Sequence, residues 1–315
     1  MSVNIGGTWT KYSIANEEGI IINKKEKTIL SGSSQSIPKR IIEIFDIFIR
    51  DRSIYNVNMI KIGVSFAGLI INSKGIASNI CGGITKNNTI PNDWLSVPFD
   101  ILYEHFNIVS LRNDVISETI LEHNFGVLKR YKHCAYVNWG TGIGCGIFSD
   151  NKIIEGKRGF AGHAGHQFVS NDTKHQCGCG NFGDLESIIG SSAVLQKYNM
   201  PLQELLFRAN SGEKKSIKIS NYLIKNISKG LFNLLVILDL EAICMGGGIF
   251  FSQPDYIINK IKSNMAEFSS LFVNDIKILH SLLHEKNQYL SGFCEIVPQK
   301  KLENWVKNFN NVWSK

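Results

Sequence analysis

Two copies of one glycine-turn pattern stand far apart in this chain and constrain its fold more than any other feature. The first copy reads Val3-Asn4-Ile5-Gly6-Gly7-Thr8 and the second Val137-Asn138-Trp139-Gly140-Thr141-Gly142. In each, an apolar run enters the turn, a second run leaves it, and a polar turn at 16–19 or 149–152 leads into a third. A single repeat of this size indicates a duplicated domain, because a solenoid needs several short periods.

An alternation of helical and strand-like segments follows each copy. Helical apolar spacing is found at 36–49, 94–106, 116–123, 217–238, 254–264 and 303–313, and strand-like runs at 60–66, 108–111 and 242–245. This alternation predicts the α/β class, and 315 residues are enough for two domains. We expect a first domain over residues 1–118 and a second over 119–296, with a last helix at about 297–315 packing back on the first.

Composition excludes several classes of protein. A hydrophobic content of 43% excludes a disordered chain. The longest apolar stretch, residues 230–251, is interrupted by Asn233, Asp239 and Glu241, which argues against a membrane span. No secretory signal is visible at the N-terminus, so we expect a cytoplasmic protein with no membrane partner.

The net charge of +7, from 34 Lys+Arg against 27 Asp+Glu, raises the question of nucleic acid. The basic residues occur in short, scattered groups rather than along one helix or loop, and no helix-turn-helix or zinc-finger spacing is present. A solvated basic surface is the favoured interpretation, and no nucleic-acid partner is expected.

The glycine turns are candidate phosphate-binding elements. Glycine lets backbone N–H groups approach a phosphate, and the threonine hydroxyl adds a donor. Neither turn is a Walker A loop, and a strand rather than a helix follows the second, which argues against a dinucleotide fingerprint. One such turn alone would be only a tight turn, whereas two matched turns favour a phosphate clamp. Gly246-Gly247-Gly248 follows the strand-like run 242–245. A nucleotide could lie against this segment, or the glycines could simply form a loop.

A candidate metal site is formed by His166, Cys177, Cys179 and Asp184. Thiolates and imidazole are preferred zinc ligands, and four ligands close a tetrahedral structural site. Cys177 and Cys179 could instead form a free dithiol pair. His163 or His175 could replace Asp184 as the fourth ligand. The remaining cysteines (Cys81, Cys134, Cys145, Cys244 and Cys294) are expected to be ordinary strand or core residues.

Asn113-Asp114 follows the strand-like run 108–111 and offers a carboxylate at the end of a strand. A general base for a hydroxyl must lie where substrate enters, and such a loop provides that position. In isolation the same pair is more often a helix cap.

Taken together, these motifs resemble the ROK family (repressor, open reading frame, kinase). The resemblance runs from residue 3 to about 295 and includes the segments Gly159-Phe160-Ala161-Gly162-His163-Ala164-Gly165-His166 and Cys177 to Glu186. It implies the actin-like ATPase (ribonuclease H-like) fold, with two duplicated α/β domains around a central cleft, commonly as a homodimer. It also implies phosphorylation of a hexose or aminohexose hydroxyl, usually O6, by ATP with Mg²⁺.

The resemblance assigns a role to each candidate residue. Asp114 would be the general base, and Asn113, His163, His166 and Glu186 would contact the sugar. The ATP-binding residues would be Gly6, Gly7, Thr8, Gly140, Thr141, Gly142, Gly246 and Gly247. The structural zinc ion would be bound by His166, Cys177, Cys179 and Asp184.

The chain departs from the family pattern at four positions. Asn4 replaces an aspartate that helps the metal, and Trp9 replaces a lysine that meets phosphate. His163 replaces a sugar-binding glutamate, and Asp184 replaces a third cysteine. Either the substrate is not glucose or catalysis is reduced. A sugar kinase is the favoured hypothesis, because Asp114 is retained. The alternatives are a sugar-binding regulator without a DNA-binding domain, and an unrelated zinc protein.

Overall fold

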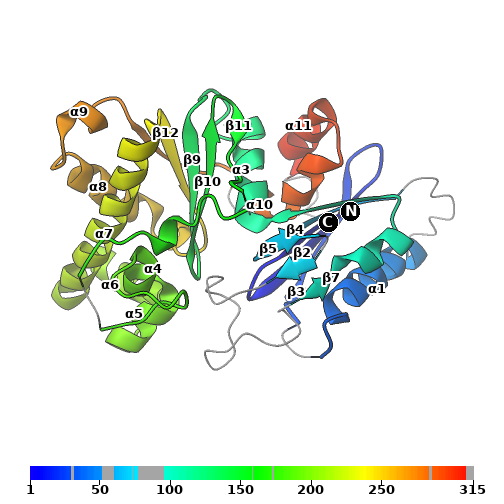
Figure 1. Ribbon diagram of the computed structural model, residues 1–315, viewed down its shortest axis with the longest axis horizontal. Helices are drawn as coiled ribbons and strands as arrows, with labels where there is room; N and C mark the ends of the chain where they lie inside the picture. The colour runs from blue at the N-terminus through cyan, green and yellow to red at the C-terminus, as the bar shows by residue number, and fades with distance from the viewer. Residues whose placement is uncertain are drawn as a thin grey trace. The chain divides into compact units, whose positions relative to one another are not determined.

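The structure is a computed structural model that describes residues 1–29, 32–51, 60–72, 74–76, 96–157, 159–171, 174–283 and 286–309. Cys81 and the ends of two expected helices, at 94–95 and 310–313, lie outside these residues. The chain divides into two compact units (Figure 1). Unit 1 is Met1–Phe125 with Glu285–Lys315, and unit 2 is Gly126–His284.

Unit 1 is built on a five-stranded sheet with the order β3-β2-β1-β4-β8. Strands β1, β2 and β3 are antiparallel neighbours, while β1, β4 and β8 run parallel. Its strands, α-helices and 3₁₀ helices (η) are, in chain order, β1 (Ser2–Ile5), β2 (Trp9–Ala15), β3 (Ile20–Lys27), α1 (Ser36–Asp51), β4 (Lys61–Phe66), β5 (Leu69–Ile71), β6 (Lys74–Ile76), β7 (Val97–Pro98), η1 (Phe99–Glu104), β8 (Ile108–Asn113), α3 (Asp114–Phe125), α10 (Lys286–Leu290), η4 (Ser291–Glu295) and α11 (Gln299–Asn308).

Helix α1 buries an apolar stripe against the sheet of unit 1. Ile37, Ile41, Ile44 and Phe45 recur at the three- and four-residue spacing of one helix face and join the core with the inward side chains of β1, β2 and β4. The returning segments α10 and η4 pack against β1. The C-terminal part of the chain therefore completes unit 1.

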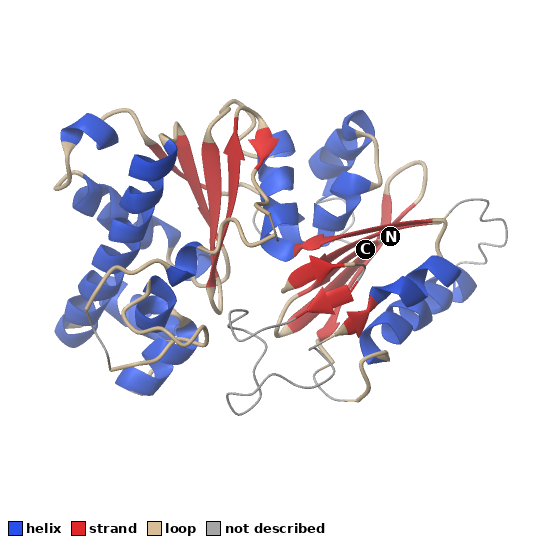
Figure 2. Ribbon diagram, viewed as in Figure 1, coloured by secondary structure: helices blue, strands red, loops and turns tan. Residues whose placement is uncertain are grey.

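Unit 2 contains a second five-stranded sheet, with the order β11-β10-β9-β12-β13. Figure 2 shows its strands in red beside a group of blue helices. Its elements are β9 (Cys134–Trp139), β10 (Ile143–Ser149), β11 (Lys152–Ile153), η2 (Ala164–His166), α4 (Leu185–Ile189), α5 (Ser191–Tyr198), α6 (Leu202–Asn210), α7 (Lys214–Leu238), β12 (Ala242–Gly246), η3 (Phe250–Ser252), α8 (Pro254–Met265), α9 (Ser270–Val273) and β13 (Lys277–His280).

The two sheets have the same topology. In each sheet, the first three strands along the chain are antiparallel, and the glycine turn connects the first strand to the second. Two further strands run parallel to the first strand and extend the sheet on its other side. The predicted duplication of an α/β unit is therefore confirmed. The core of unit 2 is formed by the inward residues of its central strands together with α4, α6, α7 and α8.

The helix expected over 94–106 is wrong in its described part. Residues 97–98 form the short strand β7, which pairs with β6, and a 3₁₀ helix follows. Pro98 lacks an N–H and biases Val97 toward extended backbone, so an α-helix cannot run through this pair. Phe99 and Leu102 are both fully buried, because a spacing of three residues places them on one face of the 3₁₀ helix.

The expected domain limits of 1–118 and 119–296 also differ from the two units. Helix α3 continues unbroken through residue 118 to Phe125, and the chain returns to unit 1 at Glu285 rather than near 297. The last described helix begins at Gln299 rather than Glu303. Across the described residues, no helix has both the length and the apolar character needed to cross a membrane.

Candidate functional site

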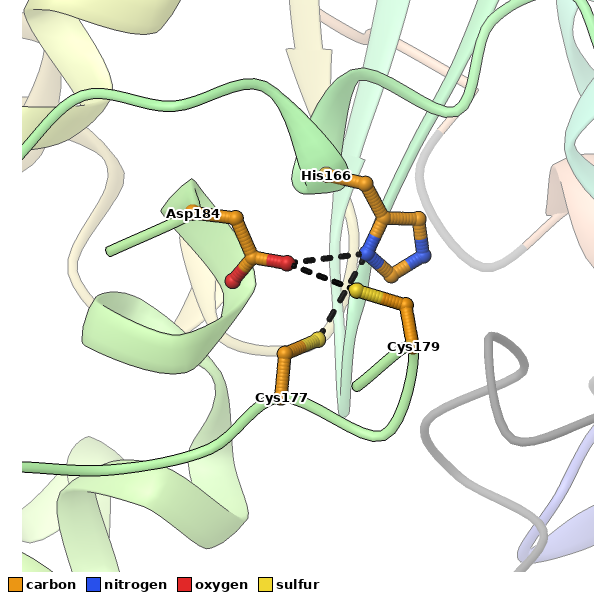
Figure 3. A group of neighbouring side chains, drawn as sticks. All are labelled: His166, Cys177, Cys179 and Asp184. Atoms are coloured by element: carbon orange, nitrogen blue, oxygen red, sulfur yellow. Dashed lines mark hydrogen bonds and ion pairs between the residues drawn. The ribbon is translucent and has the colours of Figure 1, made fainter. Parts of the chain in front are cut away.

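Four potential metal ligands of unit 2 point toward one another (Figure 3). They are His166, Cys177, Cys179 and Asp184, and their ligand atoms all lie within 4.8 Å of one another. Oδ2 of Asp184 lies 3.3 Å from Nδ1 of His166 and 3.1 Å from Sγ of Cys179. Nδ1 of His166 is 3.5 Å from Sγ of Cys177. Ligands of tetrahedral zinc are separated by about 3.3–3.8 Å, so these three separations are close to those of a zinc site.

Burial and hydrogen bonds determine which members of this group are ionised. Burial raises the pKa of the Cys177 and Cys179 thiols, so they are protonated at neutral pH unless a positive charge is bound nearby. Asp184 is fully buried, which opposes ionisation, yet hydrogen bonds from His166 and the two thiols lower its pKa to about 2. A divalent cation would supply the charge that lets both thiols ionise.

The two alternative histidine ligands do not join this group. His163 and His175 lie in the described part of the chain but outside the four-residue cluster. The ring of His163 stacks on that of His166, with centroids 5.9 Å apart, and its centroid lies 5.5 Å from that of the Phe160 ring. Burial, followed by the neighbouring His166, lowers the pKa of His163, which favours a neutral imidazole.

The second glycine turn and the Gly246–Gly248 segment lie together in unit 2. The Ile249 N–H donates to the Trp139 carbonyl at 3.0 Å, and so joins the end of β9 to the segment after β12. A Cβ atom on Gly247 would lie 2.4 Å from Oδ1 of Asn138, and its φ of +96° also demands glycine. The structure thus brings together the candidate ATP residues Gly140, Thr141, Gly142, Gly246 and Gly247.

Glu186 reaches the same turn from α4. Its Oε2 accepts a hydrogen bond of 2.8 Å from the Ile143 N–H and would lie 2.5 Å from a Cβ atom placed on Gly142. Burial raises the pKa of this carboxyl group. The structure therefore gives Glu186 a contact with the glycine turn that the sequence did not suggest.

The first glycine turn lies in unit 1, at the end of β1. Gly6, Gly7 and Thr8 connect β1 to β2, and Thr28 fastens the turn by donating its N–H to the Thr8 carbonyl at 3.1 Å and its hydroxyl to the Gly6 carbonyl at 2.7 Å. Thr8 itself is exposed. Trp9, which follows it, lies 4.5 Å (ring centroid) from the Lys25 ammonium.

Asn4 precedes this turn and is buried in a polar environment. Its Nδ2 donates to Oγ of Ser291 at 3.5 Å, and the same Oγ is 3.1 Å from the Ser65 hydroxyl. On the neighbouring strand, Lys11 is the register partner of Asn4. The family pattern has a carboxylate at this position, whereas the side chain here is an amide that donates to a hydroxyl.

Asn113 and Asp114 lie where β8 ends and α3 begins. Oδ1 of Asn113 accepts the Ile116 N–H at 3.1 Å, and its Nδ2 donates to the Gly68 carbonyl at 3.1 Å. The helix-cap interpretation therefore holds for Asn113, whose amide is engaged at both ends. Burial raises the pKa of Asp114 to about 6, although the Val115 N–H that its Oδ1 accepts at 2.9 Å acts in the opposite direction.

Three contacts of the second glycine turn were missed from the sequence. Ser191 donates its N–H to the Thr141 carbonyl at 3.1 Å and its hydroxyl to the Gly140 carbonyl at 3.3 Å. The Trp139 indole N–H donates to the Ile189 carbonyl at 3.2 Å. The available signal was the Gly190-Ser191 pair before a helical segment, which is typical of a helix start but gives no tertiary partner.

The chain is similar to proteins named as sugar kinases and to one named as a repressor. The family model described as "ROK family" matches residues 1–297. A glucokinase of Thermotoga maritima is 23% identical over 273 residues, covering 79% of this chain and 81% of that protein. An N-acetylmannosamine kinase of Vibrio cholerae is 28% identical over 263 residues, covering 80% and 85%. A xylose repressor of Caldicellulosiruptor bescii is 24% identical over 306 residues, covering 88% and 74%.

A solved structure establishes the fold. The glucokinase of Streptomyces griseus in complex with glucose and AMPPNP superimposes with a TM-score of 0.70 at 20% identity, covering 93% of this chain and 97% of the other. The expected actin-like ATPase fold is confirmed by this similarity together with the duplicated sheets.

Proposed function

The chain belongs to the ROK family, and on that basis we propose that it is an ATP-dependent sugar kinase. Its substrate is a hexose or aminohexose, and the accepting oxygen is O6. The kinase names of two relatives support the activity, and the position of Asp114 at the start of α3, directly after β8, is the single observation that carries the mechanism. A carboxylate with a pKa of about 6 is ionised at neutral pH and is still basic enough to accept a proton.

In this mechanism Asp114 accepts the proton of the sugar hydroxyl as that oxygen attacks the γ-phosphate of ATP. Phosphoryl transfer depends mainly on positioning and charge stabilisation. The glycine turns at 6–8 and 140–142 supply backbone N–H groups to the phosphates, and Gly246-Gly247 accommodates the adenosine. His163, His166 and Glu186 contact the sugar, and Asn113 holds Asp114 at the start of α3 besides meeting a neighbouring hydroxyl. Mg²⁺ neutralises the phosphate charge when bound.

A substrate screen tests this proposal. Protein of measured zinc content is supplied with ATP, Mg²⁺ and one sugar at a time from a panel of hexoses and N-acetylhexosamines, and ADP release is recorded. We expect one sugar to dominate, and its 6-deoxy analogue to give no turnover. Turnover of the 6-deoxy analogue would exclude O6 as the accepting oxygen. If folded protein released no ADP with any sugar of the panel, the proposed kinase activity would be rejected.

A sugar-binding regulator is the second candidate, and Asn4 favours it. This buried amide stands where the family pattern has a carboxylate that helps the metal, and one relative is a repressor. Calorimetry separates the two: sugar binding without any ATP binding supports the regulator, whereas binding of both supports the kinase.

We also propose that the protein is a cytoplasmic homodimer that holds one structural zinc ion per chain and binds no nucleic acid. Size-exclusion chromatography with light scattering gives the mass of the protein in solution. A monomer at micromolar concentration would contradict the dimer. A gel-shift titration with duplex DNA at physiological salt should show no complex.

A further inference from the structure

Residues 186–191 hold the second glycine turn at four points. These residues comprise most of α4 and the start of α5. The four contacts are Ile143 N–H to Glu186 Oε2 at 2.8 Å, Ser191 N–H to the Thr141 carbonyl at 3.1 Å, Ser191 hydroxyl to the Gly140 carbonyl at 3.3 Å, and Trp139 indole to the Ile189 carbonyl at 3.2 Å. The position of the turn therefore depends on the positions of α4 and of the first residue of α5.

Asp184 fixes the start of α4 and also belongs to the metal-ligand cluster. Its Oδ1 accepts the Ser187 N–H at 2.8 Å, which caps the helix, and its carbonyl accepts the Ser187 hydroxyl at 2.7 Å. Its Oδ2 faces His166 and Cys179 (Figure 3). The two oxygens of one fully buried carboxylate thus serve two different structures. A cysteine here could bind a metal but has no second atom with which to cap the helix.

We propose that Asp184 couples zinc occupancy to the order of the 140–143 turn, through α4 and Glu186. A bound ion would fix Oδ2 and so hold the carboxylate in the orientation that caps α4. The ordered helix presents Glu186 to the turn and positions Ser191, which begins α5. Because coupling is reciprocal, a ligand that orders the turn also strengthens zinc binding. The consequence for ATP phosphates rests on the proposed function, whereas the coupling between zinc and the turn does not.

Hydrogen exchange measured by mass spectrometry tests the coupling in the wild-type protein. Exchange of the segments 139–144 and 185–190 is compared between zinc-loaded and chelator-treated protein, with 223–235 of α7 as the internal reference. We expect removal of zinc to accelerate exchange roughly fivefold to tenfold in the first two segments, the effect of losing one capping interaction. The reference segment should not change. Equal rates with and without zinc, or equal acceleration in all three segments, would overturn the proposal.

Two substitutions at residue 184 separate its two tasks. In D184N the side-chain carbonyl still caps α4, since asparagine is as good a cap as aspartate, but the anionic ligand is lost. We expect much weaker zinc binding and exchange at 139–144 that no longer responds to the chelator. In D184C the thiolate retains zinc while the cap is removed. We expect about one zinc ion per chain, yet faster exchange at 139–144 than in zinc-loaded wild type; an unchanged rate would contradict the role of the cap.

Calorimetry with AMPPNP links this coupling to nucleotide binding. Zinc-loaded wild type should bind the analogue several-fold more tightly than chelator-treated protein. If AMPPNP binds neither form while the exchange coupling is present, the proposed kinase fails and the coupling stands. If AMPPNP binds both forms equally and the exchange rates are the same with and without zinc, the coupling is rejected while the proposed kinase activity is retained.

Discussion

A Cβ atom added to Gly63 would lie 1.7 Å from the carbonyl oxygen of Gly292, so β4 and η4 meet backbone against backbone. Neither partner is a flexible side chain that could move aside. We expect Gly63→Ala to lower the free energy of unfolding by about 3 kcal/mol through overpacking. The melting temperature should fall by roughly 6–12 °C. Gly248→Ala is the matched control, because no atom lies within 4 Å of its added Cβ, and an equal loss there would contradict this explanation.

Replacing the proposed base should remove activity without unfolding the protein. Asp114→Asn keeps an oxygen that can accept the Val115 N–H but cannot accept a proton from substrate. We expect kcat to fall about 10²–10⁴-fold, the usual contribution of a positioned base, while KM for ATP changes little. Steady-state kinetics on the best sugar of the screen measure both constants, and a variant with wild-type kcat would remove Asp114 from the mechanism.

The same carboxylate predicts the acid limb of the pH profile. Its pKa is raised to about 6, and only the ionised form can act as a base. The rate kcat/KM should therefore be constant near pH 8 and fall tenfold per pH unit well below pH 6. A profile that stays level down to pH 5 would show that the reaction does not depend on this ionisation.

Asp114 and Asn113 should have opposite effects on stability. The pKa of Asp114 is higher in the folded chain than its ordinary 3.8, so folding favours the protonated form, and stability is lost as pH rises from about 4 through about 6. At pH 8, Asp114→Asn should therefore increase the free energy of unfolding by about 1–2 kcal/mol. Asn113→Ala removes the cap of α3 and should decrease it by about 1 kcal/mol. Urea unfolding at pH 8 and pH 4 measures both, and the gain from Asp114→Asn should disappear at the lower pH.

Zinc should be present at about one ion per chain and be lost when a thiolate is removed. Cys179→Ser should reduce the zinc content several-fold and lower the melting temperature, because the four donors no longer close the site. Cys134→Ala is the control: this thiol is buried in β9 and lies outside the four-residue group. Elemental analysis gives the metal content, and a Cys179→Ser variant with full zinc would reject the proposed ligand set.

Restoring the carboxylate at residue 4 should increase activity. In Asn4→Asp the Ser291 hydroxyl, which the Asn4 side chain already contacts, can donate to a new carboxylate oxygen, so the charge is not left without a hydrogen bond. We expect a higher kcat/KM and half-maximal activity at a lower Mg²⁺ concentration. Asn4→Ala, which adds no charge, should show neither effect, and an unchanged Mg²⁺ dependence in Asn4→Asp would separate residue 4 from the metal.

Features that depend on short stretches of sequence were predictable. Glycine turns between apolar runs predicted both antiparallel ends of the sheets, and the ligand types at 166–184 predicted a cluster that the structure brings together. The contacts of Ser191 and Glu186 with the turn at 140–143 were not predictable, because they join segments more than forty residues apart through backbone groups that every residue carries. At 97–102 the error had a local cause, since Pro98 changed the helix type while leaving the apolar spacing intact.

The return of the chain to unit 1 has a consequence for protein synthesis. Unit 2 is one uninterrupted stretch, whereas η4, which packs on β1 and β4, is made only after all of unit 2. A chain that leaves the ribosome from its N-terminus can therefore complete unit 2 while the first sheet still lacks the segment that covers one of its faces. We expect the nascent chain to rely on chaperones during this interval.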